Sequence, residues 1–146
     1  MDALRNVTVA DPAAGVNFTY THPPKLVSVV RNLRMRFQHD LNAGNRNIVI
    51  SLFEPGGLLM SSVYFTAAVT LVDTWNYFLL RSETDTAQGV FAFGGPYVSH
   101  AECPYFALLP GWQIRSQVQG LFVGDQISEI RLLLEDLSLG AVGAVA

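Results

Sequence analysis

The segment His100-Ala-Glu102-Cys103-Pro104 carries the residue types of a metal-dependent hydrolytic site. The His-x-Glu spacing occurs in zinc deaminases, where cysteines of a Pro-Cys-x-x-Cys pair help to hold the metal and the glutamate transfers the proton. Cys103 is the only cysteine of the chain, so this pair is missing. The same count excludes an intrachain disulfide and disfavours a cysteine-based zinc site. The segment is therefore predicted to be an ordinary loop.

The three histidines are scattered along the chain. His22 lies in an extended N-terminal segment, His39 ends a strand-like run, and His100 lies in the expected loop. Histidines in such places usually face solvent, although a metal shared at a symmetry axis, with one histidine from each subunit, remains an alternative. We expect no metal site.

No nucleophile or acid–base pair stands out. Cys103 and His100 are three residues apart in a predicted turn, which is weak support for a dyad. Adjacent carboxylates at Glu135 and Asp136 would point to opposite faces of a strand. Glu83 and Asp85 share a face, but in a polar loop where they are expected to be solvated. The serines in strand-like runs lack the Gly-x-Ser-x-Gly context: Ser51, Ser61, Ser62 and Ser116.

Glycine-rich stretches do not add a cofactor site. Residues 56–57 and 94–96 contain paired glycines but lack the lysine and the helix start of a phosphate-binding loop. We therefore expect a protein that is not an enzyme, with no catalytic residue and no cofactor.

The composition favours a protein that is covered by other proteins. Only 14% of the 146 residues are charged and half are hydrophobic, whereas a typical domain has about 25% charged residues. Eight arginines accompany a single lysine, Lys25. Lysine is depleted and arginine enriched at protein interfaces, although a GC-rich genome would also replace lysine by arginine. The net charge of −3 gives the whole molecule no attraction to nucleic acid phosphates.

Alternation of apolar and polar residues predicts strands through most of the chain. Leu33, Met35 and Phe37 alternate with polar residues, as in a strand with one buried face. Turn residues separate further runs at intervals of about 8–12 residues, which is typical of an antiparallel β-sandwich or jelly roll. The runs are 26–38, 47–53, 58–73 (one long strand, or two with a bulge), 76–81, 89–93, 97–99, 105–109, 112–118 and 126–136.

The last two runs show the clearest pattern. Residues 112–118 and 126–136 both alternate, and we predict that they pair with each other as antiparallel neighbours. Leu133 lies on the more polar face of the second run, so this face is expected to be partly covered. A helix over residues 127–137 is the alternative, because isoleucine, leucine and glutamate also form helices.

The expected organisation is a β-sandwich domain over residues 25–137 with an appendage at each end. Residues 1–24 form an extended N-terminal arm, since His22-Pro-Pro disfavours a helix there. Residues 138–146 form a short tail of small and apolar residues. The start of the chain does not resemble a signal peptide, and no apolar run reaches the roughly 20 residues of a spanning helix. We expect synthesis in a cytoplasm and no membrane partner.

Three groups of residues are predicted to form interfaces. Arg31, Arg34 and Arg36 project from the strand over 26–38, and we expect them to pair with carboxylates of a neighbouring subunit. We expect no aromatic residue on the same face, so single-stranded nucleic acid is not an expected partner. The aromatics near strand ends are either core residues or anchors of an interface or glycan-binding patch, and the tail residues are the third group: Trp75, Tyr77, Tyr97, Tyr105, Leu139, Val142 and Val145.

Residues 109–136 resemble small β-sandwich virion proteins of tailed bacteriophages. The shared pattern is a Leu-Pro-x-Gly-Trp turn, a strand ending in Gly-Leu-x-x-Gly-Asp-Gln, and a last strand of the Ile-x-Leu-Leu-Val-Glu-Glu type. This chain lacks the spacer residue of the first element. The middle segment, residues 36–50, also resembles the Val-Ala-Asn-Arg-x-Val stretch of these proteins, and the resemblance as a whole covers roughly residues 26–137.

The resemblance implies a structural component of a phage particle. We expect a capsid decoration, or cement, protein that is located in the virion and binds the major capsid protein as a symmetric homotrimer. The alternatives are a receptor- or glycan-binding module of a head or tail fibre, and a head–tail adaptor or tail-terminator ring. The number of copies in a ring would separate this last alternative from a trimer.

Overall fold

The computed structural model describes residues 3–65, 68–70, 72–81 and 97–137. Within these ranges the chain forms ten strands and no helix. The strands are β1 (Ala3–Val9), β2 (Thr19–Thr21), β3 (Ser28–Gln38), β4 (Val49–Phe53), β5 (Leu59–Tyr64), β6 (Trp75–Arg81), β7 (Tyr97–Glu102), β8 (Ala107–Leu108), β9 (Gln113–Ser116) and β10 (Gln126–Asp136). The predicted all-β fold is confirmed.

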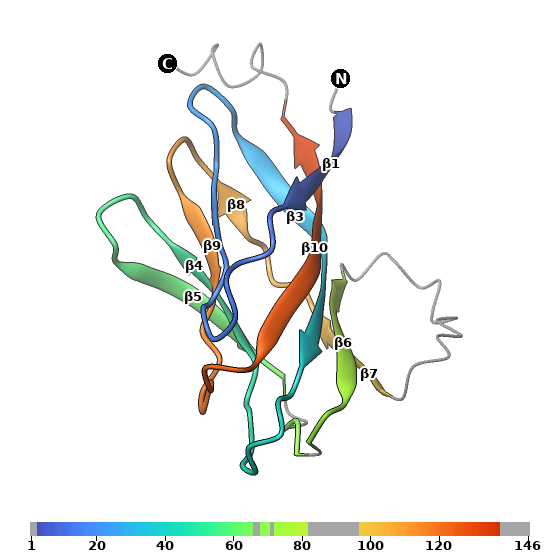
Figure 1. The fold of residues 1–146 in the computed structure, drawn as a ribbon. Coiled ribbons are helices and arrows are strands. Elements are labelled where there is room, and N and C mark those ends of the chain that lie inside the picture. Colours follow the sequence, from blue (N-terminus) through green and yellow to red (C-terminus); the bar gives the residue numbers. More distant parts are fainter. Residues whose placement is uncertain (1–2, 66–67, 71, 82–96, 138–146) are drawn as a thin grey trace.

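Two sheets face each other as the layers of a sandwich (Figure 1). The six-stranded sheet has the order β1-β10-β3-β6-β7, and β8 pairs with the first residues of β3. The four-stranded sheet has the order β2-β9-β4-β5. All pairs are antiparallel except β6 with β7, which run parallel.

The strand order is that of a jelly roll. If β7 and β8 are set aside as an insertion, eight strands remain, and these can be renumbered 1 to 8 in chain order, so that β9 becomes strand 7 and β10 becomes strand 8. The two sheets then have the orders 1-8-3-6 and 2-7-4-5. Strands that are consecutive in sequence then mostly lie in opposite sheets, as in double-sheet jelly rolls. The jelly-roll-like sandwich predicted from the strand spacing is the observed architecture.

The core lies between the two sheets and follows the period-2 pattern. Leu33, Met35 and Phe37 of β3 are at most 1% exposed, and they pack in one cluster with Ile50 of β4 and Ile114 of β9. Alternate residues of a strand point to opposite faces, so the intervening residues of β3 face outward. The alternation in the sequence therefore predicted the inward face of this strand correctly.

The predicted pairing of the last two strands is wrong. β9 lies in the four-stranded sheet between β2 and β4, whereas β10 lies in the six-stranded sheet between β1 and β3. Both strands bury one face in the same core, so their patterns are alike whether they pair or face each other. The connecting residues 117–125 are longer than a hairpin loop of about 2–5 residues, because they cross from one sheet to the other.

The expected N-terminal arm contributes a strand to each sheet. β1 pairs with β10 along seven residues, and β2 pairs with β9. Phe18 and Tyr20 are buried in the core. Residues 3–24 are thus extended but are part of the sandwich, because unpaired backbone groups and apolar side chains find partners there.

Other strand predictions differ from the structure in detail. The run over 58–73 forms β5 only as far as Tyr64, and the helix considered for 127–137 is instead the strand β10. β7 extends through Glu102, so the segment around His100 is mainly strand rather than the predicted loop. The predicted strand over 89–93 and the tail over 138–146 lie outside the described residues. No helix long and apolar enough to cross a bilayer occurs in the part of the chain that the structure describes.

Candidate functional site

The three arginines form a row on the outer face of the six-stranded sheet, which we call the arginine row: Arg31, Arg34 and Arg36. Arg31 donates through Nε to Glu135 Oε2 at 2.8 Å. Arg36 Nε lies 3.1 Å from Glu129 Oε2, and Arg34 Nη2 lies 3.5 Å from Glu129 Oε1. The row therefore pairs with carboxylates of its own β10, which differs from the predicted pairing with a neighbouring subunit.

A bulge in β10 brings Glu129 to the arginine row. The register of β10 against β3 shifts between Ser128 and Arg131, and Glu129 has a φ of +51°. A bulge adds a residue to one strand and re-aims its side chain. Glu129 consequently reaches two arginines that lie two residues apart on β3. Since these side chains are 25–38% exposed, each pair contributes about 0–1 kcal/mol.

Aromatic rings share the face of the arginine row, contrary to expectation. The guanidinium carbon of Arg36 lies 4.5 Å from the ring centroid of Trp75, and that of Arg34 lies 5.4 Å from that of Tyr77. The arginines on β3 and the aromatics on β6 are cross-strand neighbours, which only the sheet register could establish. The interleaved Glu129 and Glu135 offset the positive charge that a nucleic acid would require.

The other predicted interface residues do not join the arginine row as a group. Tyr97 begins β7 opposite Asn76. Tyr105 precedes β8 and is 76% exposed. Leu139, Val142 and Val145 lie outside the described residues. The predicted surface thus divides into separate regions of the molecule.

A groove opens between the two sheets beside β5, and we call it the β3–β5 groove. It has a volume of about 700 Å³ and is lined by residues 29–31, 62–64 and 102–105. Val30 is 3% exposed, whereas Tyr64 and Tyr105 are 61% and 76% exposed. The groove thus combines a buried apolar floor at Val30 with two exposed tyrosines and, among its lining residues, the charged Arg31 and Glu102.

Cys103 lies in this groove as an inert thiol. Burial raises the pKa of Cys103 to about 11, so the thiolate that would act as a nucleophile is scarce near neutral pH. Its Sγ lies 3.4 Å from the carbonyl oxygen of Pro104 and 3.7 Å from that of Val30. The arrangement does not support a cysteine nucleophile.

Two of the histidines are buried, which differs from the solvent-facing positions expected for them. His22 is 1% exposed and His39 is fully buried, whereas His100 is exposed. Each buried histidine belongs to a polar network, and the two networks lie at different ends of β3. The direct partners of both histidines are near in sequence, but the residues that complete each network, Asp136 and Asp125, come from the last strand and the loop before it.

The first network joins β1, β2, β3 and β10 through His22. Asp136 accepts from Arg5 Nε at 2.8 Å and from Ser28 Oγ at 2.5 Å. Ser28 Oγ therefore accepts from His22 Nε2 at 3.1 Å. The other ring nitrogen, Nδ1, then accepts the hydroxyl proton of Tyr20 at 3.0 Å. The neutral Nε2–H tautomer thus satisfies the whole chain of contacts.

This arrangement is not a catalytic triad. A serine nucleophile needs a histidine as its base and a carboxylate on the far side of that histidine. Here Ser28 lies between His22 and Asp136, is itself fully buried, and donates its proton to the carboxylate. The network holds strands together.

The His22 network makes stability depend on pH. Burial, and secondarily the charge of Arg5, lowers the pKa of His22. The hydrogen bond from Arg5 lowers the pKa of Asp136. In both cases the folded state binds a proton less readily than the unfolded state. The stability from His22 is therefore present above its unfolded pKa of about 6.5 and that from Asp136 above about 3.9, and each is lost as the pH falls through the folded value.

Replacement of His22 by glutamine is expected to reduce the pH dependence of stability between pH 7 and pH 5. The measurement is the free energy of unfolding by urea at several pH values. His100→Gln is the control, because it measures how much an exposed histidine contributes to the pH dependence of the free energy of unfolding. The pKa of His100 is also lowered by desolvation. An unchanged slope in His22→Gln would contradict the assignment.

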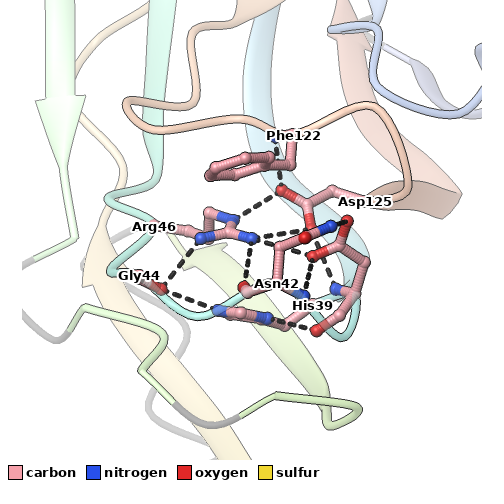
Figure 2. A network of polar contacts seen from close by, with 7 residues as sticks. His39, Asn42, Gly44, Arg46, Phe122 and Asp125 are labelled. Carbon is pink, nitrogen blue, oxygen red and sulfur yellow. Dashed lines mark hydrogen bonds and ion pairs between the residues drawn. The ribbon is translucent and has the colours of Figure 1, made fainter.

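The second network joins two loops at the other end of β3 (Figure 2), and we call it the Arg46–Asp125 clasp. Both side chains are fully buried, and Arg46 Nε donates to Asp125 Oδ2 at 2.6 Å. The remaining donors of Arg46 reach Gly44 O at 2.9 Å, Asn42 O at 3.0 Å and Asp40 Oδ1 at 3.0 Å. The ring centroid of Phe122 lies 4.6 Å from the guanidinium carbon.

Asp125 also fixes the backbone of both loops. Its Oδ1 accepts from the backbone N–H of Asp40 at 2.9 Å, and its Oδ2 accepts from that of Phe122 at 2.8 Å. His39 contacts the carbonyl oxygens of Asp40 and Gly44, each at 2.7 Å. One buried carboxylate thereby connects residues 40–46 with residues 122–125.

The clasp contains three residue types that bind metals. Ligand atoms of His39, Asp40 and Asp125 lie within 4.8 Å of one another. However, Arg46 places its positive charge between the two carboxylates, and both ring nitrogens of His39 contact carbonyl oxygens. The geometry fits an internal ion pair better than a metal centre.

Sequence reasoning did not identify the clasp as a structural unit, although both of its charged residues belong to motifs shared with the phage virion proteins. Arg46 belongs to the Asn-Arg stretch over residues 44–50, and Asp125 belongs to Gly-Leu-x-x-Gly-Asp-Gln. The structure shows that these two motifs meet in one buried ion pair between loops. Their spacing in the sequence, 79 residues, concealed the contact.

No protein-family model matches the chain, and no curated protein matches its sequence. Solved structures of infectious bursal disease virus share a distant likeness. A chain of the T13 viral particle is 10% identical, with a TM-score of 0.43 over 92% of this chain and 31% of that one. A chain of the Gx strain is 13% identical, with a TM-score of 0.43 over 96% and 33%.

The VP2 subviral particle of the same virus is 9% identical, with a TM-score of 0.35 over 94% of this chain and 41% of that one. The present chain thus spans about a third of the length of the first two chains it matches. At these identities and TM-scores, the likeness assigns neither a family nor a function to this chain.

Proposed function

We propose that this chain is a non-enzymatic structural protein of a tailed-bacteriophage virion, which binds the major capsid protein as a symmetric oligomer. Its task is capsid decoration, with a homotrimer over junctions between shell subunits. The observation that carries the proposal is the exposed apolar surface at the start of β5. Leu58, Leu59 and Met60 are 61%, 50% and 47% exposed on the hairpin that joins β4 and β5.

The hairpin surface is suited to contact with another protein. Residues 55–64 contain no charged side chain. β5 is an edge strand of the four-stranded sheet (Figure 1). Full burial of one such side chain stabilises a contact by about 1.5–3 kcal/mol. Several copies joined around an axis multiply a modest contact by avidity. This is how a small protein would stay attached to a shell under internal pressure.

The fold and the motif resemblance support the same proposal from other directions. Jelly rolls occur in viral capsid proteins and also in lectins. The fold is therefore compatible with both a structural and a glycan-binding role, and it does not decide between them. Residues 109–136 resemble phage virion proteins in a pattern that includes Asp125 of the clasp. The proposed role accounts for the low charge content as well as for the exposed hairpin.

The alternative is a glycan-binding module of a fibre. Tyr64 and Tyr105 are exposed beside the β3–β5 groove, and exposed aromatic rings can anchor a bound ligand. Binding of labelled protein to host cells or to immobilised glycans, abolished by Tyr105→Ser, would favour this alternative over decoration.

Particle binding tests the proposal directly. Purified protein is mixed with phage heads that lack it, and copies per particle are counted by quantitative mass spectrometry and electron microscopy. We expect hundreds of copies on the shell. A dozen copies or fewer at one vertex would indicate a connector or fibre, and a protein that is monomeric and does not bind heads would refute the proposal.

A double variant, Leu58→Lys with Leu59→Lys, is expected to lower shell affinity at least tenfold, since the loss of one buried apolar side chain costs about 1.5 kcal/mol or more. Val123→Lys is the matched control, because Val123 is 80% exposed in the loop before β10. Truncation of residues 1–24 is unsuitable as a test, since it would remove Phe18 and Tyr20 from the core.

A further inference from the structure

The β3–β5 groove borders an open sheet edge. β5 pairs with β4 on one side, and no backbone hydrogen bond reaches its other side from any described residue. Edge strands are usually guarded against pairing by charges, proline or short length. The six residues of β5 carry neither charge nor proline. Among the described residues, the backbone groups along this edge have no strand beside them, and a further strand could pair with them.

The groove continues from this edge into the interior between the sheets. Val63 of β5 packs on the core, and Val30 and Cys103 form the opposite, mostly buried side. A strand added to β5 would place alternate side chains toward these residues. The volume of about 700 Å³ suits small side chains, and Tyr64 and Tyr105 would cover them.

We propose that the β3–β5 groove binds residues 138–146 of a neighbouring copy as an extended strand added to the edge of β5. This inference rests on the proposed symmetric oligomer and names the contact that joins its copies. The mode is strand addition, in which backbone hydrogen bonds provide affinity and alternate side chains provide specificity.

The sequence of this segment matches the groove. Residues 138–146 consist of serine, leucine, glycine, alanine and valine, with no charge and no aromatic ring. Such a segment can lie on an apolar floor without burying a charged group. Nine extended residues span about 30 Å, which exceeds the length of the six-residue strand β5. Leu139, Val142 and Val145 supply its larger side chains.

The direction of β10 favours a neighbour's groove over the groove of the same copy. β10 runs antiparallel to β3, and the backbone N–H of Leu137 donates to Val27 O at 2.9 Å. The chain at Leu137 is thus heading past the start of β3, whereas its own groove lies in the opposite direction, at residues 29–31. A contact between a segment of one copy and a groove of the next is heterologous, and such a contact forms a ring, for example a trimer, when the rotation between copies closes.

Cys103 provides a native reporter inside the groove. One tagged protein carries Val142→Cys with Cys103→Ser, and a second, differently tagged protein keeps Cys103 as its only cysteine. The two are mixed, allowed to exchange subunits, and oxidised with diamide at pH 9, where the buried thiol ionises more readily than at neutral pH. A disulfide forms only where the two Cα atoms come within about 4.4–6.8 Å.

We expect a disulfide between the two differently tagged proteins. A matched control replaces Val142→Cys by Val123→Cys, which lies on an exposed loop and should give no cross-link. Val145→Cys provides a second position, since it differs from Val142 by three residues and so points to the opposite face of a strand. Cross-linking of Val142→Cys or Val145→Cys to Cys103 supports the inference.

Truncation after Leu137 completes the test. We expect the truncated protein to be monomeric by mass measurement at a concentration where the full chain is oligomeric. Its melting temperature should equal that of the full chain measured at a dilution where the full chain is also monomeric. If it stays oligomeric and no cross-link forms, the inference is overturned, and pairing of β5 with β5 of a second copy would be one such result. In a third protein that carries both Val142→Cys and the native Cys103, a disulfide that forms only within one copy also overturns the inference. Either result leaves the proposed function intact if the protein still binds heads, whereas a monomeric full chain that ignores heads refutes the proposed function itself.

Discussion

Replacing Asp125 by asparagine is expected to lower the free energy of unfolding by about 3–5 kcal/mol, the cost of leaving a buried charge without its partner. Asp125 and Arg46 are both fully buried and lie 2.6 Å apart (Asp125 Oδ2 to Arg46 Nε). Asparagine keeps the shape of the side chain but removes its charge. Arg46 would then retain a single carboxylate, that of Asp40, which is 11% exposed. Urea unfolding at pH 7 measures the effect.

A double-mutant cycle separates the ion pair from the rest of the network. Arg46→Met should cost a similar amount, because it leaves Asp125 buried without a cation. The double variant Arg46→Met with Asp125→Asn should cost clearly less than the sum of the two, since neither charge is then left alone. Glu129→Gln is the exposed counterpart and should cost at most about 2 kcal/mol, because each of its two pairs contributes about 0–1 kcal/mol. Additive costs in the cycle would show that the two side chains act independently.

Replacing Gly120 by alanine is expected to have the second large effect on stability. Gly120 has a φ of +81°, and an added Cβ would lie 2.5 Å from the backbone oxygen of Asn45. The left-handed backbone costs a residue with a side chain about 1–2 kcal/mol, and overpacking adds about 1–3 kcal/mol. The loop before β10 would have to move away from residues 45–47, which it contacts through the backbone pair Asn47 and Gln119.

Gly57→Ala is the matched control for Gly120→Ala. Gly57 has a φ of +87° but has nothing within 4 Å of an added Cβ. It should therefore show only the backbone cost, and the difference between the two variants measures the contact with Asn45. Equal melting temperatures for the two variants would show that the loops separate easily, which would also weaken the clasp as a rigid connection.

Several features of the fold were accessible to sequence reasoning because they are local. The alternation in β3 and β10 shows which side chains face inward, since the period of a strand is two residues wherever the strand lies. Turn residues marked the boundaries of β4 and of β9 for the same reason. The absence of a second cysteine ruled out a deaminase-like site without any structure.

Other features depended on partners that are distant in sequence. β9 and β10 have similar patterns, and a pattern records that a face is buried but not which strand lies beside it. The arginine row was found from β3 alone, but Glu129 reaches it only through a bulge in β10 and Trp75 only through the register with β6. His22 and His39 were expected in solvent because Asp136 and Asp125, which complete their networks, are about 114 and 86 residues away in sequence.

The sequence by itself determined an all-β chain with one inward face per strand, low charge and no recognisable catalytic motif, because these follow from residue types and a two-residue period. Only the tertiary structure decided that Arg46 meets Asp125, that the first residues join both sheets, and that an unguarded edge borders a groove at Cys103. Contacts of this kind depend on which strands become neighbours, and burial in a common core is compatible with many such arrangements until backbone pairing and buried charges select one.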